Sequence, residues 1–369
     1  MDKKRVPLGD YVTEYSVRNK SDEDIPVYSV TNSQGFCTEY FDKEVASKDK
    51  KTYKIVPRGY FAYNPSRINV GSVDWQRFED KVIVSPLYNV FYVSEEMDQQ
   101  YLYYFLRSDI GRQMIKAKAS GSVRDNLKMD MLKEMTIPYK TFEEQKKCVD
   151  TLDELQKIIA LREKEIEKLD DLIKARFVEM FGHPDLNEKG WKMNTFGDIC
   201  TVRQGLQIPI SKRLTEYEED CYEYITVQYL HGGKEREYIK SPKPTVICTK
   251  DDILMTRTGN TGMVITNVDG VFHNNFFLID FDREKYDKDF LVQYLNLDLI
   301  QADILRRAGT STIPDLNHGE FYKIRVFEPP FDLQRQFNDF KRQVDKSKFI
   351  NINIIPEGGF YNGDKFYIS

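Results

Sequence analysis

The sequence predicts an α+β chain in which two tandem mixed α/β domains are separated by long coiled-coil helices. Three observations lead to this fold class. Segments of the two halves repeat at a nearly fixed offset, a proline-free stretch between them carries a heptad pattern, and the same order of strand-like runs and helix follows in each half. The 369 residues, 40 % of them hydrophobic, are also sufficient to bury two cores of ordinary domain size.

The repeat sets the domain organisation. The segment PLGDYV at 7–12 returns as TFGDIC at 195–200, an offset of 188 residues. A second set of matching positions lies 189 residues apart: Leu127, Leu132, Ile137, Phe142 and Gln145 in the first half, and Leu316, Phe321, Val326, Phe331 and Gln334 in the second. We therefore expect one domain over residues 1–141 and a duplicate of it over residues 183–330.

Each half has the same succession of expected elements. Short runs rich in Tyr, Val and Ile predict strands, for example VIVSPLYNVFYV in the first half and VFHNNFFLIDF in the second. An amphipathic pattern then predicts one helix at 98–119 and its counterpart at 287–308. A turn of small residues and a last strand ending near proline complete each half, which describes a mixed α/β domain.

The stretch 142–182 between the halves predicts a long central spacer helix. It has no proline, and its apolar residues follow a heptad seam: Leu152, Leu155, Ile159, Ile166, Leu169, Ile173, Phe177 and Met180. About 40 residues span about 60 Å of helix, so the seam needs a partner helix rather than the surface of one compact domain. A solvated linker helix is the alternative, although a linker needs no heptad seam.

Residues 331–349 occupy the equivalent place after the second half and predict a short second spacer helix, followed by an atypical C-terminal tail at 350–369. A helix of that length covers about 28 Å, around half of the seam. We therefore expect partner-binding contacts on the uncovered part of the seam, at residues that include Ile159, Ile166, Leu169 and Ile173.

Composition excludes several classes of protein. No apolar run approaches the roughly 20 residues of a membrane span, and the N-terminus MDKKRVPLGD has no apolar signal core, so we expect a cytoplasmic protein without a membrane partner. The five cysteines form no CxxC pair and the four histidines are scattered, so we expect no metal site. The net charge of −5 means that any binding of nucleic acid must come from local patches or be shared with a partner.

Two loops stand out because they have the same composition in both halves. YNPSRINVGSV (63–73) and LMTRTGNTGMV (254–264) each place an arginine and a run of Asn, Gly, Ser or Thr between strand-like residues. Arginine suits phosphates and guanine edges, and amides and hydroxyls suit other base edges. With two further turns, SGSVRDNLK and VRQGLQ, they give the DNA-binding candidates Arg67, Asn69, Gly71, Ser72, Arg124, Asn126, Lys128, Arg203, Gln204, Gln207, Arg257, Thr258, Asn260 and Thr261. The alternative is a set of ordinary turns in which Gly and Asn only satisfy positive φ.

Enzyme motifs are incomplete. YNPS at 63–66 lacks the second proline and the aromatic residue of an amino-methyltransferase loop, and TRTGNTG lacks the Gly-Lys-Ser/Thr ending of a phosphate loop. PDLNHGEFYK at 314–323 has the residue types of a nuclease cluster at the wrong spacing, and neither HExxH nor GxSxG occurs. No catalytic residue is therefore predicted.

Two divergent halves joined by LDELQKIIALREKEIEKLDDLIKARFVEMFG, with YNPSRINVGSV and DILMTRTGNTG, resemble the specificity subunit of type I restriction-modification systems. The resemblance implies two target recognition domains, each reading one half of a split site in double-stranded DNA, and helices that pair antiparallel as a spacer and dock modification (methyltransferase) subunits. It implies a non-catalytic chain without a cofactor, with S-adenosylmethionine, ATP and Mg on the partner subunits, among them the restriction (translocase/endonuclease) subunit. The short second helix and the atypical tail depart from the family pattern.

Two other functions fit the same residues. One is the recognition subunit of a related system in which a fused partner both cuts and methylates, and the other is a non-DNA scaffold whose two domains bind proteins on a coiled-coil spacer. A neighbouring methyltransferase reading frame would favour either recognition subunit, and a salt-dependent mobility shift on duplex DNA would exclude the scaffold.

Overall fold

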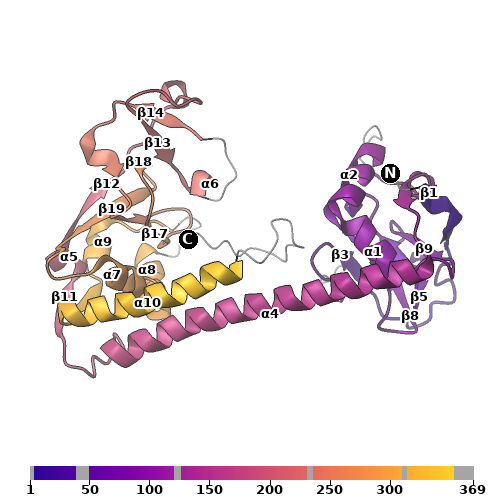
Figure 1. The fold of residues 1–369 in the computed structure, drawn as a ribbon, viewed down its shortest axis with the longest axis horizontal. Coiled ribbons are helices and arrows are strands. Elements are labelled where there is room, and N and C mark those ends of the chain that lie inside the picture. The colour runs from indigo at the N-terminus through magenta and orange to yellow at the C-terminus, as the bar shows by residue number, and fades with distance from the viewer. Residues whose placement is uncertain (1–3, 39–49, 120–125, 231–235, 310–313, 353–369) are drawn as a thin grey trace. The chain divides into compact units, whose positions relative to one another are not determined.

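The structure is a computed structural model that describes residues 4–38, 50–119, 126–230, 236–309 and 314–352 (Figure 1). The chain divides into two compact units, unit 1 within Met1–Leu161 and unit 2 within Arg162–Pro356. The long helix α4 (Phe142–Phe181) contributes its N-terminal half to unit 1 and its C-terminal half to unit 2.

Unit 1 is built on a four-stranded antiparallel sheet in the order β2-β9-β6-β7. Its strands are β2 (Val12–Glu14), β6 (Phe61–Tyr63), β7 (Val73–Trp75) and β9 (Asn89–Val93). Three antiparallel pairs surround it: β1 (Arg5–Pro7) with β10 (Thr136–Pro138), β3 (Ser29–Thr31) with β4 (Gly35–Cys37), and β5 (Lys54–Pro57) with β8 (Lys81–Val84). Short 3-10 turns lie at Leu8–Asp10, Lys50–Thr52 and Ile68–Val70.

Two helices stand in unit 1 where the sequence predicts one over 98–119. Helix α1 (Gln99–Arg107) ends before Ser108, whose extended backbone (ψ 159°) starts a new direction, and α2 (Asp109–Ala119) follows at once. The Ser108 hydroxyl accepts the Gly111 N–H at 3.1 Å, which caps the second helix and makes the break a defined corner. The single-helix prediction was wrong here because a serine can cap a new helix inside a continuous amphipathic pattern. The remaining helix of the domain is α3 (Met129–Lys133).

Unit 2 repeats the same central sheet in the order β12-β19-β16-β17. Its strands are β12 (Cys200–Gln204), β16 (Ile253–Thr256), β17 (Val264–Ile265) and β19 (Phe276–Phe281). A second sheet has the order β14-β13-β18-β15, formed by β13 (Cys221–Ile225), β14 (Tyr238–Lys240), β15 (Ile247–Cys248) and β18 (Gly270–Phe272), and β11 (Lys192–Thr195) pairs with β20 (Arg325–Glu328).

Besides the C-terminal half of α4, the described part of unit 2 contains six helices. They are α5 (Phe196–Ile199), α6 (Val227–Leu230), α7 (Lys288–Leu295), α8 (Asp298–Ala308), α9 (His318–Tyr322) and α10 (Phe331–Ile352), with 3-10 turns at Ile210–Lys212 and Pro244–Val246. The single helix predicted at 287–308 is again two helices, α7 and α8, separated at Asn296 and Leu297. The corner is thus part of the duplicated fold.

A buried glutamine makes the same three hydrogen bonds in each unit. Gln145 in α4 donates to the carbonyls of Glu96 (2.9 Å) and Lys140 (3.1 Å) and accepts the Asp98 N–H (2.9 Å). In α10, 189 residues later, Gln334 donates to Lys285 O (2.9 Å) and Pro329 O (2.9 Å) and accepts the Asp287 N–H (2.8 Å). Asp98 and Asp287 are the N-caps of α1 and α7, so each glutamine joins the start of a spacer helix to the start of a domain helix.

Helix α10 packs antiparallel on the C-terminal half of α4 within unit 2 (Figure 1). Near the start of α10, the Phe337 ring meets Phe177 and Phe181 at centroid distances of 5.3 and 5.6 Å. Further along α10, Lys348 pairs with Asp170 of α4. The predicted fold class, two mixed α/β domains separated by long coiled-coil helices, is confirmed.

Candidate nucleic-acid interface

In unit 2 the candidate loop lies at one edge of the central sheet, between β16 and β17. Thr256 at the end of β16 shapes it: its hydroxyl donates to Asn260 O and accepts the Met263 N–H at 2.9 Å, and its carbonyl accepts the Gly262 N–H at 2.9 Å. Gly259 and Gly262 have φ values of 86° and 91°, which strain any residue with a Cβ. The loop is therefore a fixed turn whose outer residue Asn260 is exposed.

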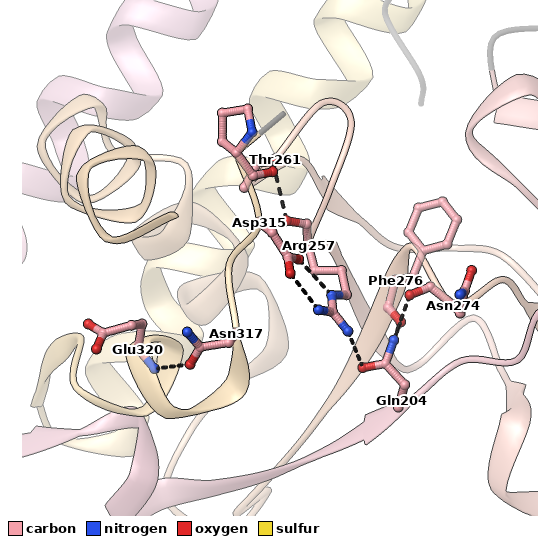
Figure 2. Close-up of polar contacts among 9 residues, drawn as sticks. Gln204, Arg257, Thr261, Asn274, Phe276, Asp315, Asn317 and Glu320 are labelled. Atoms are coloured by element: carbon pink, nitrogen blue, oxygen red, sulfur yellow. Dashed lines mark hydrogen bonds and ion pairs between the residues drawn. The ribbon is translucent and has the colours of Figure 1, made fainter. Parts of the chain in front are cut away.

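Arg257 is the centre of a polar cluster in this loop (Figure 2). Its Nε and Nη2 donate to the two carboxylate oxygens of Asp315 at 2.9 and 2.7 Å, and its Nη1 donates to Gln204 Oε1 at 3.3 Å. Gln204, at the end of β12, is itself held because its amide donates to Asn274 O at 2.5 Å. The candidates Gln204 and Arg257, 53 residues apart in the chain, are thus brought together by the sheet.

Further contacts fasten the loop to the segment that precedes α9. The Leu316 N–H donates to Arg257 O at 2.8 Å, and the Thr261 hydroxyl donates to Pro314 O at 2.8 Å. Asn317 then caps α9 by accepting the Glu320 N–H at 3.0 Å (Figure 2). Thr258 forms an isolated bridge with Asp315, so the loop and this segment make one surface.

The charges of the cluster reinforce one another. The hydrogen bond from Arg257 holds the pKa of the Asp315 carboxyl below its ordinary value, and the bond to Asp315 raises the pKa of Arg257. Burial lowers the pKa of His318 nearby, with Arg257 acting in the same direction. The cluster therefore carries a carboxylate and a guanidinium at neutral pH, close to a neutral imidazole.

Unit 1 places its candidate loop at the corresponding edge, between β6 and β7. The Leu127 N–H donates to Pro65 O at 3.1 Å, which brings the described residues 126–128 against the loop as Leu316 does in unit 2. Arg67 is exposed, and its side chain has no hydrogen bond or ion pair with the described part of the chain. Asn69 is also exposed, so these two side chains are available to a ligand.

One expectation about the unit 1 loop was wrong, and one similarity between the two loops is only apparent. Ser72 is 2 % exposed and its hydroxyl donates to Val30 O, so it fastens β7 to β3 and is not available to DNA. Arg67 is also not the counterpart of Arg257: the backbone bonds of Leu127 and Leu316 match Pro65 to Arg257. Gly71 (φ 98°) matches the equivalent turn glycine of unit 2, and it is buried, which leaves only its backbone to the loop.

The other candidates divide by exposure. Lys128 and Gln207 are exposed, and Arg203 is half-buried with Nη1 donating to Thr245 O at 3.3 Å. Asn126 is half-buried beside Leu127. Arg124 lies outside the residues that the structure describes.

Sequence reasoning missed Asp315, the residue that orients Arg257. Its counterpart at the 189-residue offset is Asn126, which was a candidate, so the repeat carried the signal. The nuclease-like spacing around Asp315 has a structural explanation, because Glu320 pairs with Lys323 and Asp315 pairs with Arg257.

The expected partner face of α4 is covered in part by the chain itself. Ile166 and Ile173 are 2 % and 4 % exposed, and Leu169 packs against the unit 2 core that contains Ile173. The prediction of partner contacts was wrong for Ile166 and Ile173, which are buried where α10 lies along the C-terminal half of α4 within unit 2. Ile159 is half-buried, and three of the exposed apolar residues of α4 lie beside it: Leu155, Ile158 and Leu161.

The chain matches the type I restriction modification DNA specificity domain over residues 10–171 and 188–357. It belongs to this family. Both halves carry a copy of the domain, and the resemblance inferred from the spacer helix and the loops is confirmed.

Curated relatives of the specificity family come from Methanocaldococcus jannaschii. The type I restriction enzyme MjaIX specificity subunit is 29 % identical over 36 % of this chain and 34 % of its own length. The MjaVIII specificity subunit is 22 % identical over 40 % of this chain and 34 % of its own length. These matches span about a third of each relative.

Solved structures agree in fold. A chain from a structural study of complex assembly and conformational transition of the type I R-M system has a TM-score of 0.61 at 16 % identity, covering 96 % of this chain and 94 % of that one. The type I restriction-modification system S subunit from M. genitalium has a TM-score of 0.52 at 16 % identity, covering 96 % and 92 %.

The described residues contain neither a membrane-spanning helix nor a metal cluster. No helix there is both long and apolar enough to cross a membrane. No cluster of three or more His, Cys, Asp or Glu side chains that could hold a metal ion occurs in the described segments.

Proposed function

We propose that this chain is the DNA-recognising specificity subunit of a type I restriction-modification complex, in which unit 1 and unit 2 each read one half of a split site. One observation carries the proposal: the same backbone frame occurs twice and presents different polar side chains at the same edge of its sheet. Leu127 and Leu316 hold that edge with equivalent bonds, while the loops carry Arg67 and Arg257 at non-equivalent positions. Equal frames that present different polar side chains suit two half-sites of different sequence.

In this proposal the chain binds DNA and partner subunits but performs no catalysis. Modification subunits bring the methyl donor S-adenosylmethionine, the restriction subunit brings ATP and Mg, and the complex works in the cytoplasm. Three exposed apolar residues near the middle of α4, Leu155, Ile158 and Leu161, supply a surface for the modification subunits. The net charge of −5 fits a shared interface, in which partner subunits provide part of the positive charge that DNA binding needs.

A domain exchange tests the proposal. Cells that carry the complex are mapped for methylated sites before and after residues 1–141 are replaced by the corresponding half of another specificity subunit. We expect one half of the bipartite site to change and the other half and the overall architecture to remain. Alteration of both halves would contradict the separate reading by each unit, and absence of any duplex binding would favour the protein scaffold.

A further inference from the structure

The inference rests on the proposed function and concerns which residue of unit 2 reads a base. Arg257 has both its charge and its orientation fixed before any ligand arrives: Asp315 binds one edge of the guanidinium and Gln204 binds Nη1. The pair is not buried, since the side chains of Arg257 and Asp315 are 28 % and 49 % exposed. An ion pair this exposed contributes little to folding, so its main physical effect is to hold the guanidinium in one position.

The bonds leave donors free on the guanidinium. Arginine has five N–H groups, and the three bonds to Asp315 and Gln204 use one on each nitrogen. Nη1 and Nη2 therefore each keep one N–H without a partner among the described residues. The remaining Nη2 N–H faces Nη1, and an Nη1 N–H on that same end would complete a fork that matches the O6 and N7 acceptors of guanine in the major groove.

The Asp315 carboxylate favours a base over a phosphate as the ligand of Arg257. Asp315 neutralises Arg257 and places a half-exposed negative charge next to it, which repels a phosphate. The acceptors of a guanine edge are uncharged, so a neutralised but well-oriented arginine still binds them through directed hydrogen bonds. Arg67 in unit 1 has the opposite character: it is exposed and has no carboxylate partner in the described segments.

The cluster is specific to unit 2. At the matching positions unit 1 has Pro65 for Arg257 by its backbone bond to Leu127, and Asn126 for Asp315 by the 189-residue offset. Neither residue can form the ion pair, although the backbone frame is the same. A charge cluster needed for the frame itself would be expected in both copies.

We propose that Arg257 is a specificity-determining residue that reads a guanine in the half-site bound by unit 2, with Asp315 and Gln204 as its positioning residues. Removal of the Arg257 fork then removes discrimination at one base pair. Removal of the Asp315 charge alone releases the arginine, which loses selectivity and gains general attraction to phosphate.

Selection from a randomised duplex pool tests this, using the full chain in complex with the methyltransferase subunits of its own host. The parent is expected to enrich a guanine at one position, and Arg257→Gln to lose about 5- to 150-fold of that preference while all other positions stay unchanged. Asp315→Asn is expected to weaken the same position, to bind unrelated duplex more tightly and to steepen the slope of log affinity against log salt by about 0.9. Replacing that guanine by 7-deazaguanine, which lacks N7, should weaken the parent and leave Arg257→Gln unaffected.

Arg67→Ala is the matched control, because it should lower affinity for every duplex without changing the selected sequence. Unchanged selection by Arg257→Gln, or a uniform loss at all positions with lowered stability of unit 2, would overturn the inference and leave a structural ion pair. If Arg257→Gln does not fold, Asp315→Asn provides the test. A loss of selectivity together with a gain in affinity for unrelated duplex cannot result from a loss of stability. A parent complex that selects no sequence would instead overturn the proposed function.

Discussion

Replacing the buried glutamine of one unit should destabilise that unit alone. Gln334 is 0 % exposed and satisfies two carbonyls and one N–H, those of Lys285, Pro329 and Asp287. Leucine fills a similar volume without hydrogen bonds, so Gln334→Leu leaves three backbone groups unpaired, that of Pro329 in a buried bond and those of Lys285 and Asp287 in part-buried ones. At about 1–3 kcal/mol for each group and with partial relaxation, we expect a loss of about 3–5 kcal/mol in the free energy of unfolding.

The chain offers its own probes for this measurement. It has two tryptophans, Trp75 in unit 1 and Trp191 in unit 2, so Trp75→Phe and Trp191→Phe backgrounds report each unit separately by fluorescence during urea unfolding. Gln334→Leu should move the Trp191 transition and not the Trp75 transition, and Gln145→Leu should do the reverse. The melting temperature is expected to fall by about 2–4 °C for each kcal/mol of stability lost, so a thermal scan also detects either effect.

The control is Gln343→Leu on the same helix, since its side chain is exposed and makes no hydrogen bond with the described residues. We expect a change within about 0.5 kcal/mol for it. Equal shifts of both transitions with Gln334→Leu would show that the units unfold together through α4. A loss below 1 kcal/mol would show that water replaces the glutamine bonds, and either result would refute the reasoning.

Three further predictions concern binding. Arg67→Ala should lower affinity for duplexes of any sequence and flatten the slope of log affinity against log salt by about 0.9, measured by titration at several salt concentrations; an unchanged slope would mean that Arg67 touches no phosphate. Leu155→Asp, at 47 % exposure, should keep both units folded and abolish co-purification with modification subunits, whereas Ile173→Asp, in the unit 2 core, should unfold unit 2. Arg257 lowers the folded-state pKa of Asp315, so the ion pair is present above the ordinary carboxyl range and is lost only when the pH falls below that range. Selectivity for the guanine should therefore be equal at about pH 6 and 8. A large difference between the two pH values would contradict the charge assignment.

The repeated positions were predictable because they are buried and fixed by packing. Leu127, Leu316, Gln145 and Gln334 keep the same neighbours in each unit, and such positions change little in residue type as a duplicated fold diverges. The long helix was predictable for a related reason: a seam of apolar residues over some forty positions without proline has few alternatives to a helix. The main features of this fold were therefore predictable from the pattern of its buried residues.

Other features depend on which residues far apart in the chain lie close together in space, and one sequence does not show this. The loop of unit 1 runs seven positions from Asn64 to Gly71, while that of unit 2 runs six from Thr256 to Gly262. Because of this difference in length, residues of the same type in the two loops do not occupy equivalent positions in the structure. The ion pair of Arg257 joins residues 58 apart. Coverage of the α4 seam depends on which half of it α10 lies along, and the heptad pattern is equally good in both halves.

The frame and the reading surface are separate in each unit, and this separation explains how a duplicated domain can change its target without losing its fold. The bonds that hold the loop edge run from backbone to backbone, Leu127 N to Pro65 O and Leu316 N to Arg257 O, so the side chain at the accepting position is free to vary. Proline in one copy, with no N–H, and arginine in the other, with a long charged side chain, differ strongly, and both leave the carbonyl in place. Selection on the sequence that is read can therefore act on these side chains with little cost in stability, while the buried glutamines and leucines remain under constraint from folding alone.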